Sequence, residues 1–296
     1  MSTIVSEYEY RGRRYVSLGI TAPGEPQSLH PVAEGRLLAA LLSPDAPAAV
    51  AALTAETEPV TVTAGDPALQ ALPPLLPTTG PSLVSGFLGT HKSKADAIVG
   101  HDGQPPLPKW FFKGLGSWLR RPGQPLVVPA EPVILVEEPE VVLVFVNDEA
   151  GAPRYLGYTF GNDLCDIGLH RIDPGYTPSG KLCDTGLATH LFLGEPPRSA
   201  TGRTVIERDG QAVWEGKFDC GADALFFRVS DLVDRLFSFP ALRRPGLVNY
   251  VLTGADRSSF HDGFRIADGD RIVIDVASHG AVLANTVRFG GGASAF

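Results

Sequence analysis

Short runs of β-branched and aromatic residues, separated by Gly, Pro, Asn and Asp, follow one another along most of the chain and predict a fold rich in β-strands. Residues 7–21 predict two strands that turn at Arg11–Gly12, and residues 206–218 predict a hairpin that turns at Asp209–Gly210. Two further strands are predicted from residue 271 onward, with their turn at His279–Gly280. Helical spacing is found over residues 32–42 and 231–237. We therefore expect a mixed α+β, β-rich fold.

The composition changes between residues 43 and 81, where Ala and Pro become frequent and the stretch ends in LPPLLPTTGP. Proline-rich segments of this kind form semi-rigid linkers. We therefore expect a small N-terminal α+β domain and its linker over residues 1–80, and a catalytic domain over residues 81–296. A chain of 296 residues with 44% hydrophobic content can bury a core of this size.

Charge and cysteine content exclude several classes of protein. A net charge of −8 argues against a nucleic-acid or anionic-membrane partner. No apolar run approaches the roughly 20 residues of a membrane-spanning helix, and the N-terminal residues lack the apolar segment of a signal peptide. Cys165, Cys183 and Cys220 show no CxxC spacing, which favours free thiols in a reducing compartment. We expect a cytoplasmic protein.

Glu138 and Glu140 lie in the middle of the largely apolar run PVILVEEPEVVLVFV at residues 132–146. Side chains two apart on a strand share a face, so Glu138 and Glu140 are expected to project together. Two buried like charges are costly unless a cation lies between them. The run therefore predicts either a divalent-metal site or a strand with these two residues on its solvent-exposed face.

A third carboxylate follows an aromatic strand predicted at Tyr155–Phe160. Asp163 comes at the end of that strand, where functional groups commonly point into a cleft, and a returning hairpin would place it beside the two glutamates. Lys181 is one of few lysines in the chain. A lone lysine is normally solvated, but beside three carboxylates and a cation it would act as an acid or base.

Polar groups also occur on the glycine-flanked segment SGFLGTHKSKADAIVG, residues 85–100. His91 and its neighbours Lys92 and Lys94 suit a mobile lid over an active site, although a surface loop that contains one histidine explains the pattern equally simply. The aromatic stretch at residues 109–119 contains Lys113, and its glycines do not have the spacing of a dinucleotide-binding fingerprint.

Taken together, these motifs resemble the fumarylacetoacetate hydrolase superfamily over about residues 86–287. The resemblance is carried by Glu138-x-Glu140, by the strand that closes in Asn162–Asp163, by Lys181 and by the run DGDRIVIDVASHGAVLAN at residues 268–285. The phrases PKWFFKG, EEPEVV, SGKL and LVNYVLTGADRSSF are similar to the bacterial sugar-acid branch, which includes 2-keto-3-deoxy-arabinonate dehydratases. The resemblance implies a rolled mixed β-sheet, a homodimer and a small 2-oxo acid as substrate.

The resemblance also implies roles for particular residues. Glu138, Glu140 and Asp163 would hold Mg²⁺, or else Mn²⁺ or Ca²⁺, which agrees with the preference of hard cations for carboxylate oxygens. Lys181 would stand beside an enolate stabilised by the metal, and His91 would activate or deliver water. The expected enzyme is a lyase that dehydrates a 2-keto-3-deoxy sugar acid.

This chain differs from the superfamily pattern at residues that would bind the substrate, and not at those that would bind the metal. Relatives place a Gly-Thr pair where this chain has Gly254–Ala255, so Thr253 or a nearby serine would have to compensate. Asp166 and Arg171 become candidates for substrate contacts, with a local ion pair as the alternative. The expected substrate-binding residues are Lys113, Asp166, Arg171, Thr253 and Gly254.

Three other functions stay open. They are hydrolytic C–C cleavage of an acylpyruvate-like compound, decarboxylation, and a metal-binding dimer that has lost catalysis. An acidic partner for His91 would favour hydrolysis, because hydrolysis requires an activated water, whereas elimination requires only an acid for the departing hydroxide.

Overall fold

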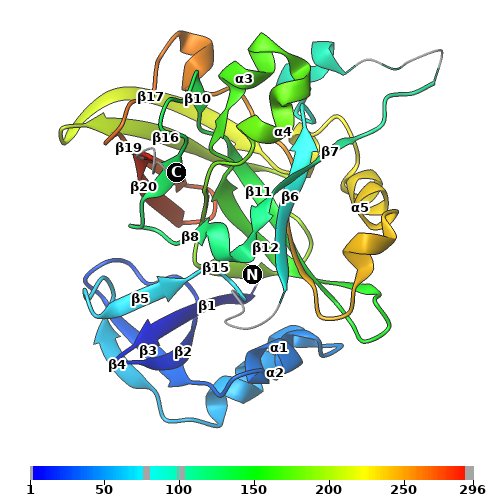
Figure 1. The fold of residues 1–296 in the computed structure, drawn as a ribbon. Helices are drawn as coiled ribbons and strands as arrows, with labels where there is room; N and C mark the ends of the chain where they lie inside the picture. Colours follow the sequence, from blue (N-terminus) through cyan, green and yellow to red (C-terminus); the bar gives the residue numbers. More distant parts are fainter. Residues whose placement is uncertain (1–2, 76–80, 99, 101–103, 291–296) are drawn as a thin grey trace, which may run out of the picture.

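The central strand of the protein is β11 (Pro139–Asn147), which is buried along its whole length. The computed structural model describes residues 3–75, 81–98, 100 and 104–290. In it, β11 pairs antiparallel with β12 (Pro153–Asn162) on one side and with β18 (Val248–Leu252) on the other (Figure 1). A strand that has neighbours on both edges and is covered on both faces needs apolar side chains at successive positions. This explains the continuous apolar sequence of residues 141–146.

Alternate side chains of β11 contribute to two different cores. Val141, Leu143 and Phe145 belong to one cluster of buried residues, whereas Val142 and Val144 belong to another. Successive side chains of a strand point to opposite faces, so this strand joins the layers on its two sides.

The large sheet has thirteen strands among the described residues, and its main order is β4-β3-β2-β1-β15-β12-β11-β18-β6-β7. Strands β5, β8 and β14 attach to this path through β1, β14 and β12. The bounds of its other strands are β1 (Thr3–Tyr10), β2 (Arg13–Leu18), β3 (Pro26–Pro31), β4 (Val60–Thr63), β5 (Leu69–Leu72), β6 (Ser82–Leu88), β7 (Lys109–Leu115), β8 (Leu119–Arg120), β14 (Thr185–Leu187) and β15 (His190–Leu193).

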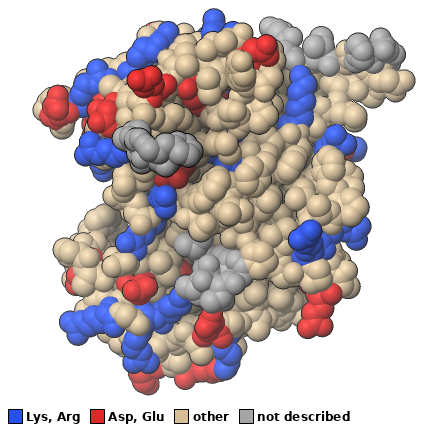
Figure 2. All heavy atoms as spheres, viewed as in Figure 1, with Lys and Arg blue, Asp and Glu red and all other residues tan. Residues whose placement is uncertain are grey.

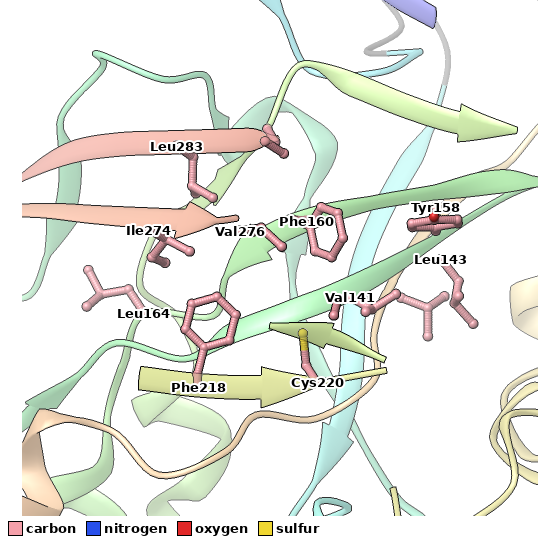
Figure 3. Packing of buried hydrophobic residues seen from close by; sticks show 14 of the residues in the cluster. Val141, Leu143, Tyr158, Phe160, Leu164, Phe218, Cys220, Ile274, Val276 and Leu283 are labelled. Carbon is pink, nitrogen blue, oxygen red and sulfur yellow. The ribbon is translucent and has the colours of Figure 1, made fainter. Parts of the chain in front are cut away.

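A five-stranded sheet packs against β11 and β12. Its order is β17-β16-β19-β20-β9. The strands are β9 (Leu126–Val128), β16 (Ala200–Arg208), β17 (Gln211–Cys220), β19 (Arg271–Val276) and β20 (Ala281–Phe289), and a separate pair is formed by β10 (Leu135–Val136) and β13 (Cys165–Asp166). Figure 3 shows the core between the two sheets, where Val141 and Phe160 lie across from Ile274 and Phe218.

The helices are short and lie outside the sheets. The α-helices are α1 (Arg36–Leu41), α2 (Ala46–Ala55), α3 (Ile167–Ile172), α4 (Thr177–Gly180) and α5 (Val229–Phe237), and the 3-10 helices are η1 (Lys92–Ala97), η2 (Gly116–Trp118), η3 (Pro174–Tyr176), η4 (Ala222–Ala224), η5 (Pro240–Arg243) and η6 (Ser259–Asp262). Within the described ranges, none of them has the length and apolar character that a membrane crossing requires.

Most of the expected elements are confirmed. The hairpins at Arg11–Gly12, Asp209–Gly210 and His279–Gly280 form as β1–β2, β16–β17 and β19–β20. The helix expected over residues 32–42 is shortened to α1. The mixed, β-rich fold class is therefore confirmed.

The Ala- and Pro-rich stretch is more regular than expected. It forms α2, β4 and β5, and α2 begins with Asp45 as its N-cap and with proline in its first turn, a common helix start. These elements belong to the residues expected to form the small N-terminal domain and its linker, and the division of the chain into two domains stays a prediction. The boundary placed near Gly80 lies outside the described residues. Strand β1 pairs with β15 in register from Thr3↔Leu193 to Ser6↔His190, which joins the N-terminal strands to the large sheet.

The distribution of charged side chains and the state of the three cysteines are as the sequence predicted. On the face that Figure 2 shows, basic and acidic side chains of the described residues are interspersed. Cys165, Cys183 and Cys220 are buried and free, as expected.

Candidate metal centre and its cavity

Three carboxylates converge at the start of β11. Glu138, Glu140 and Asp163 each offer one oxygen, and these oxygens all lie within 4.8 Å of one another. Glu140 and Asp163 are buried, with 3% and 0% exposure, and Glu138 is partly buried. The structure therefore brings together the three carboxylates that the sequence predicted to meet.

The backbone around Asn162 holds this arrangement. Glu138 precedes β11 and Asp163 follows β12, and the two strands pair Pro139 with Asn162. The Glu138 N–H donates to the Asn162 side-chain oxygen at 3.0 Å, and the Asp163 N–H donates to the Glu138 carbonyl at 2.9 Å. The ends of two antiparallel strands therefore fix the two carboxylates side by side.

Three lysines surround the carboxylates. Lys181, at the end of α4, places Nζ 2.5 Å from Asp163 Oδ2 and 2.9 Å from Glu138 Oε2. Lys113 on β7 places Nζ 2.9 Å from Asp163 Oδ1, and Lys94 on η1 places Nζ 3.0 Å from Glu138 Oε1. Ammonium groups therefore compensate the charge of the buried carboxylates.

Burial and neighbouring charge act in opposite directions on the pKa values. Burial alone would raise the pKa of Glu138, but Lys181 and Lys94 outweigh it and hold that pKa well below its usual value. Burial and the carboxylates of Asp163 and Glu138 raise the pKa of Glu140 well above its usual value. The negative charges of Asp163 and Glu138 thus oppose ionisation of Glu140, and a bound cation would offset this repulsion.

A divalent cation fits the donor set. The Lys113 ammonium donates to the Leu164 carbonyl, and it lies 2.9 Å from Asp163 Oδ1 without making a hydrogen bond to it. This buried oxygen therefore has an ion-pair partner but keeps its lone pairs for a cation. Carboxylate oxygens suit Mg²⁺, Mn²⁺ or Ca²⁺ better than softer metals.

Glu138 and Glu140 open onto a cavity of about 490 Å³, and Asp163 lies behind them. Glu138, Glu140, Lys94 and Lys181 form one polar side of its wall. The rest of the wall is mixed, with Phe87, Leu107, Ile167, Phe227 and Phe260 as its larger apolar members and His170, Arg171, Thr177, Ser258 and His261 as polar ones. A space of this size and polarity accommodates a small polar ligand.

His91 is not among the residues that line the cavity. Its side chain is buried, Nε2 lies 2.9 Å from Asp219 Oδ1, and Nδ1 lies 2.7 Å from Ser93 Oγ and 3.6 Å from Asp256 Oδ1. His91 therefore has an acidic partner, but both ring nitrogens are engaged by the protein. His91, Asp219 and Asp256 form a second group with the spacing of metal ligands.

The expected substrate-binding residues divide into two sets. Asp166 and Arg171 line the cavity. The Asp166 carboxylate accepts hydrogen bonds from the backbone N–H groups of Val133, Ile134 and Gly168, so its oxygens already have partners within the protein. The Arg171 guanidinium lies 5.4 Å from the centre of the Phe260 ring. Arg171 is therefore the better placed of the two for a ligand.

Lys113, Thr253 and Gly254 lie behind the carboxylates and not on the cavity wall. The Thr253 hydroxyl donates to the Val141 carbonyl at 3.1 Å, and the Gly254 N–H donates to Glu140 Oε2 at 2.6 Å. At Gly254, φ is +126°, and an added Cβ would meet Thr90 Oγ1 at 1.8 Å, so only glycine allows this backbone path. Lys113 and Gly254 therefore contact the carboxylates of Asp163 and Glu140, and Thr253 contacts the backbone of β11.

Two residues beside the three carboxylates were not selected from the sequence as site residues. Glu137 lies beside Glu138 but points to Ser259, and Lys94 reaches Glu138 from a distant segment. Adjacent side chains on an extended chain point to opposite sides, so the position of Glu137 next to Glu138 was only a weak signal. The sequence indicated the segment of Lys94 as a lid, but not its contact with Glu138.

No protein-family model matches the chain. A curated protein of Haloferax volcanii named "Probable 2-keto-3-deoxyxylonate dehydratase" is 28% identical over 113 residues, which span 36% of this chain and 37% of that protein. The chain thus aligns with little more than a third of that relative's length.

Solved structures match over nearly the whole chain. A 2-keto-3-deoxyarabinonate dehydratase has a TM-score of 0.68 at 17% identity, covering 97% of this chain and 99% of that one. The same kind of enzyme complexed with magnesium and 2,5-dioxopentanoate has a TM-score of 0.67 at 17% identity, with the same coverage. A 5-carboxymethyl-2-hydroxymuconate delta-isomerase of Mycobacterium smegmatis has a TM-score of 0.63 at 19% identity, covering 97% of this chain and 100% of that one.

These matches define the class of fold. The chain has the fold of these dehydratases and isomerases, and the expected resemblance to the fumarylacetoacetate hydrolase superfamily is confirmed at the level of the fold. The matched proteins include dehydratases of 2-keto-3-deoxy sugar acids, the kind of enzyme that the motifs resemble.

Proposed function

We propose that the protein is a divalent-metal-dependent lyase that dehydrates a 2-keto-3-deoxy sugar acid. The observation that carries the proposal is the convergence of Glu138, Glu140 and Asp163 beside Lys181, with Glu138, Glu140 and Lys181 on the wall of the cavity. Similarity to a dehydratase complexed with magnesium and to a sugar-acid dehydratase supports it. We further propose a cytoplasmic homodimer.

The metal would be held by the carboxylates of Glu138, Glu140 and Asp163. A dication there supplies Lewis-acid stabilisation of negative charge on the 2-oxo group of the substrate. The surrounding fold excludes water from Asp163 and Glu140, which strengthens every charge interaction at the site.

Lys181 is the group placed for proton transfer. Its Nζ contacts two of the ligand carboxylates and lies 4.6 Å from the centre of the Phe111 ring, so its position is defined on several sides. In the elimination, a proton leaves C3, the C4–O bond breaks with its electron pair on oxygen, and that oxygen takes up a proton and departs as water. Lys181 would stabilise the negative charge between these events or move one of the protons.

Hydrolytic C–C cleavage is the second candidate, because one observation favours it. The acidic partner of His91 that hydrolysis requires is present as Asp219. The position of His91 outside the cavity lining favours the dehydratase.

The test is turnover by the purified protein with Mg²⁺ or Mn²⁺, with products identified by NMR. We expect a 2-keto-3-deoxy pentonate to lose water, EDTA to abolish the reaction, and Lys181→Met to lower kcat at least a thousandfold. Lys217→Met changes an exposed lysine on β17 and is the matched control. Cleavage of an acylpyruvate alone would establish the hydrolase, and metal binding without any turnover would indicate a protein that has lost catalysis.

A further inference from the structure

Both carboxylate oxygens of Glu138 are already engaged by lysines. Oε1 lies 3.0 Å from Lys94 Nζ, and Oε2 lies 2.9 Å from Lys181 Nζ. A metal ligand must direct at least one oxygen lone pair to the ion. Each carboxylate oxygen has two lone pairs, so an ion must share an oxygen with a lysine or displace one of them. Displacing one lysine frees a whole oxygen for the metal and removes a positive charge beside it.

The two lysines are held very differently. Lys181 has 6% exposure of its side chain, a second ion pair with Asp163 and an aromatic ring beneath its ammonium. The Lys94 side chain is 22% exposed and belongs to η1, a 3-10 turn outside the sheets. Lys94 is less buried than Lys181 and makes fewer contacts. Lys94 is therefore the lysine that can be displaced.

The charge of the cluster indicates where the Lys94 ammonium goes. When all three carboxylates are ionised to bind a metal, their charge equals that of the three lysines, so a bound dication leaves two excess positive charges. A ligand that enters the cavity must supply negative charge to neutralise them. Lys94 lines that cavity together with Glu138 and Glu140, and its flexible four-carbon stem lets the ammonium turn.

We propose that Lys94 exchanges partners: it neutralises Glu138 in the metal-free protein, and in the loaded protein it binds a carboxylate of the 2-oxo acid. The proposal rests on the function proposed above. It assigns to the segment of residues 85–100 a substrate-binding residue other than His91. Because Lys94 competes with the metal but cooperates with the ligand, its loss has opposite effects on the two affinities.

The experiment measures those two affinities separately. Mn²⁺ binding to the metal-free chain is followed by electron paramagnetic resonance. Oxalate, which presents a carboxylate and a second chelating oxygen, is then titrated calorimetrically into the Mn²⁺-loaded protein. We expect Lys94→Met to tighten Mn²⁺ binding and to weaken oxalate binding, each about tenfold, the size of one partly buried charged contact.

Two variants serve as controls. Lys92→Met changes a lysine of the same turn whose Nζ donates to the Asp223 carbonyl at 2.6 Å, away from the carboxylates, and should leave both affinities unchanged. Lys94→Arg keeps the charge and should restore most of the oxalate affinity.

Three outcomes would overturn the proposal. Unchanged oxalate affinity in Lys94→Met would leave Lys94 as a structural partner of Glu138. A loss of Mn²⁺ affinity would mean that Lys94 holds Glu138 in position for the metal. A wild-type chain that binds no Mn²⁺ would remove the proposed function and this proposal together, whereas the first two outcomes leave the proposed function intact.

Discussion

The Glu137 carboxylate accepts two hydrogen bonds from Ser259, one from its backbone N–H and one from its hydroxyl, each 2.7 Å long. Both residues are buried, with 1% and 0% exposure. Ser259 begins η6, and Ser258, Phe260 and His261 around it line the cavity. The contact therefore ties one wall of the cavity to the segment that carries Glu138.

Removing the Glu137 carboxylate should destabilise the protein and loosen this wall. We expect Glu137→Ala to lower the free energy of unfolding by about 3 kcal/mol, because it leaves the buried donors of Ser259 without acceptors. Glu137→Gln keeps one acceptor oxygen and should cost about 1 kcal/mol. Urea denaturation measures both values, and equal losses in the two variants would contradict the role of the hydrogen bonds.

The Asp163 carboxylate should be required for metal binding. Asp163→Asn keeps the shape of the side chain and removes its charge, so we expect Mn²⁺ affinity to fall at least a hundredfold. The chain should stay folded but lose about 3 kcal/mol of stability, since Lys113 and Lys181 lose a buried partner.

Asp184→Asn is the matched control for that measurement. Asp184 pairs with Arg120 at 2.8 Å and is not among the residues of the cavity wall, so its loss should leave Mn²⁺ binding unchanged. Wild-type Mn²⁺ affinity in Asp163→Asn would exclude Asp163 as a ligand.

Stability should fall in weak acid because of His190. Its Nδ1 lies 2.6 Å from Ser6 Oγ at the pairing of β1 with β15, and burial lowers its pKa from 6.5 to about 4. The folded state thus favours the neutral ring, so this stability is present above pH 6.5 and is lost as the pH falls toward 4. Between pH 7 and pH 5 the loss should reach about 2 kcal/mol.

Comparison with His190→Gln isolates this effect from other titrating groups. The difference in unfolding free energy between the wild type and the variant should shrink by that amount from pH 7 to pH 5. A difference that does not change with pH would show that His190 titrates alike in the folded and unfolded chains.

The sequence by itself determined most of the secondary-structure elements and the three carboxylates that meet. Hairpins were predictable at Arg11–Gly12 and Asp209–Gly210 because turn chemistry is local. The meeting of Glu138 and Glu140 with Asp163 was predictable because strand periodicity and one hairpin suffice to bring them together. Composition did not indicate the regular elements within residues 46–72, where Val50 and Leu53 of helix α2 pack into a core.

Only the tertiary structure decided which side chains surround the three carboxylates. Lys94 and Ser259 reach Glu138 and Glu137 from 44 and 122 residues away along the chain, and His91 turns to Asp219 at a separation of 128 residues. Such contacts depend on how the two sheets and their connections pack, which no local pattern of residues encodes. The physical reason is that side-chain periodicity specifies a face of a strand, whereas the partner on that face is set by the whole fold.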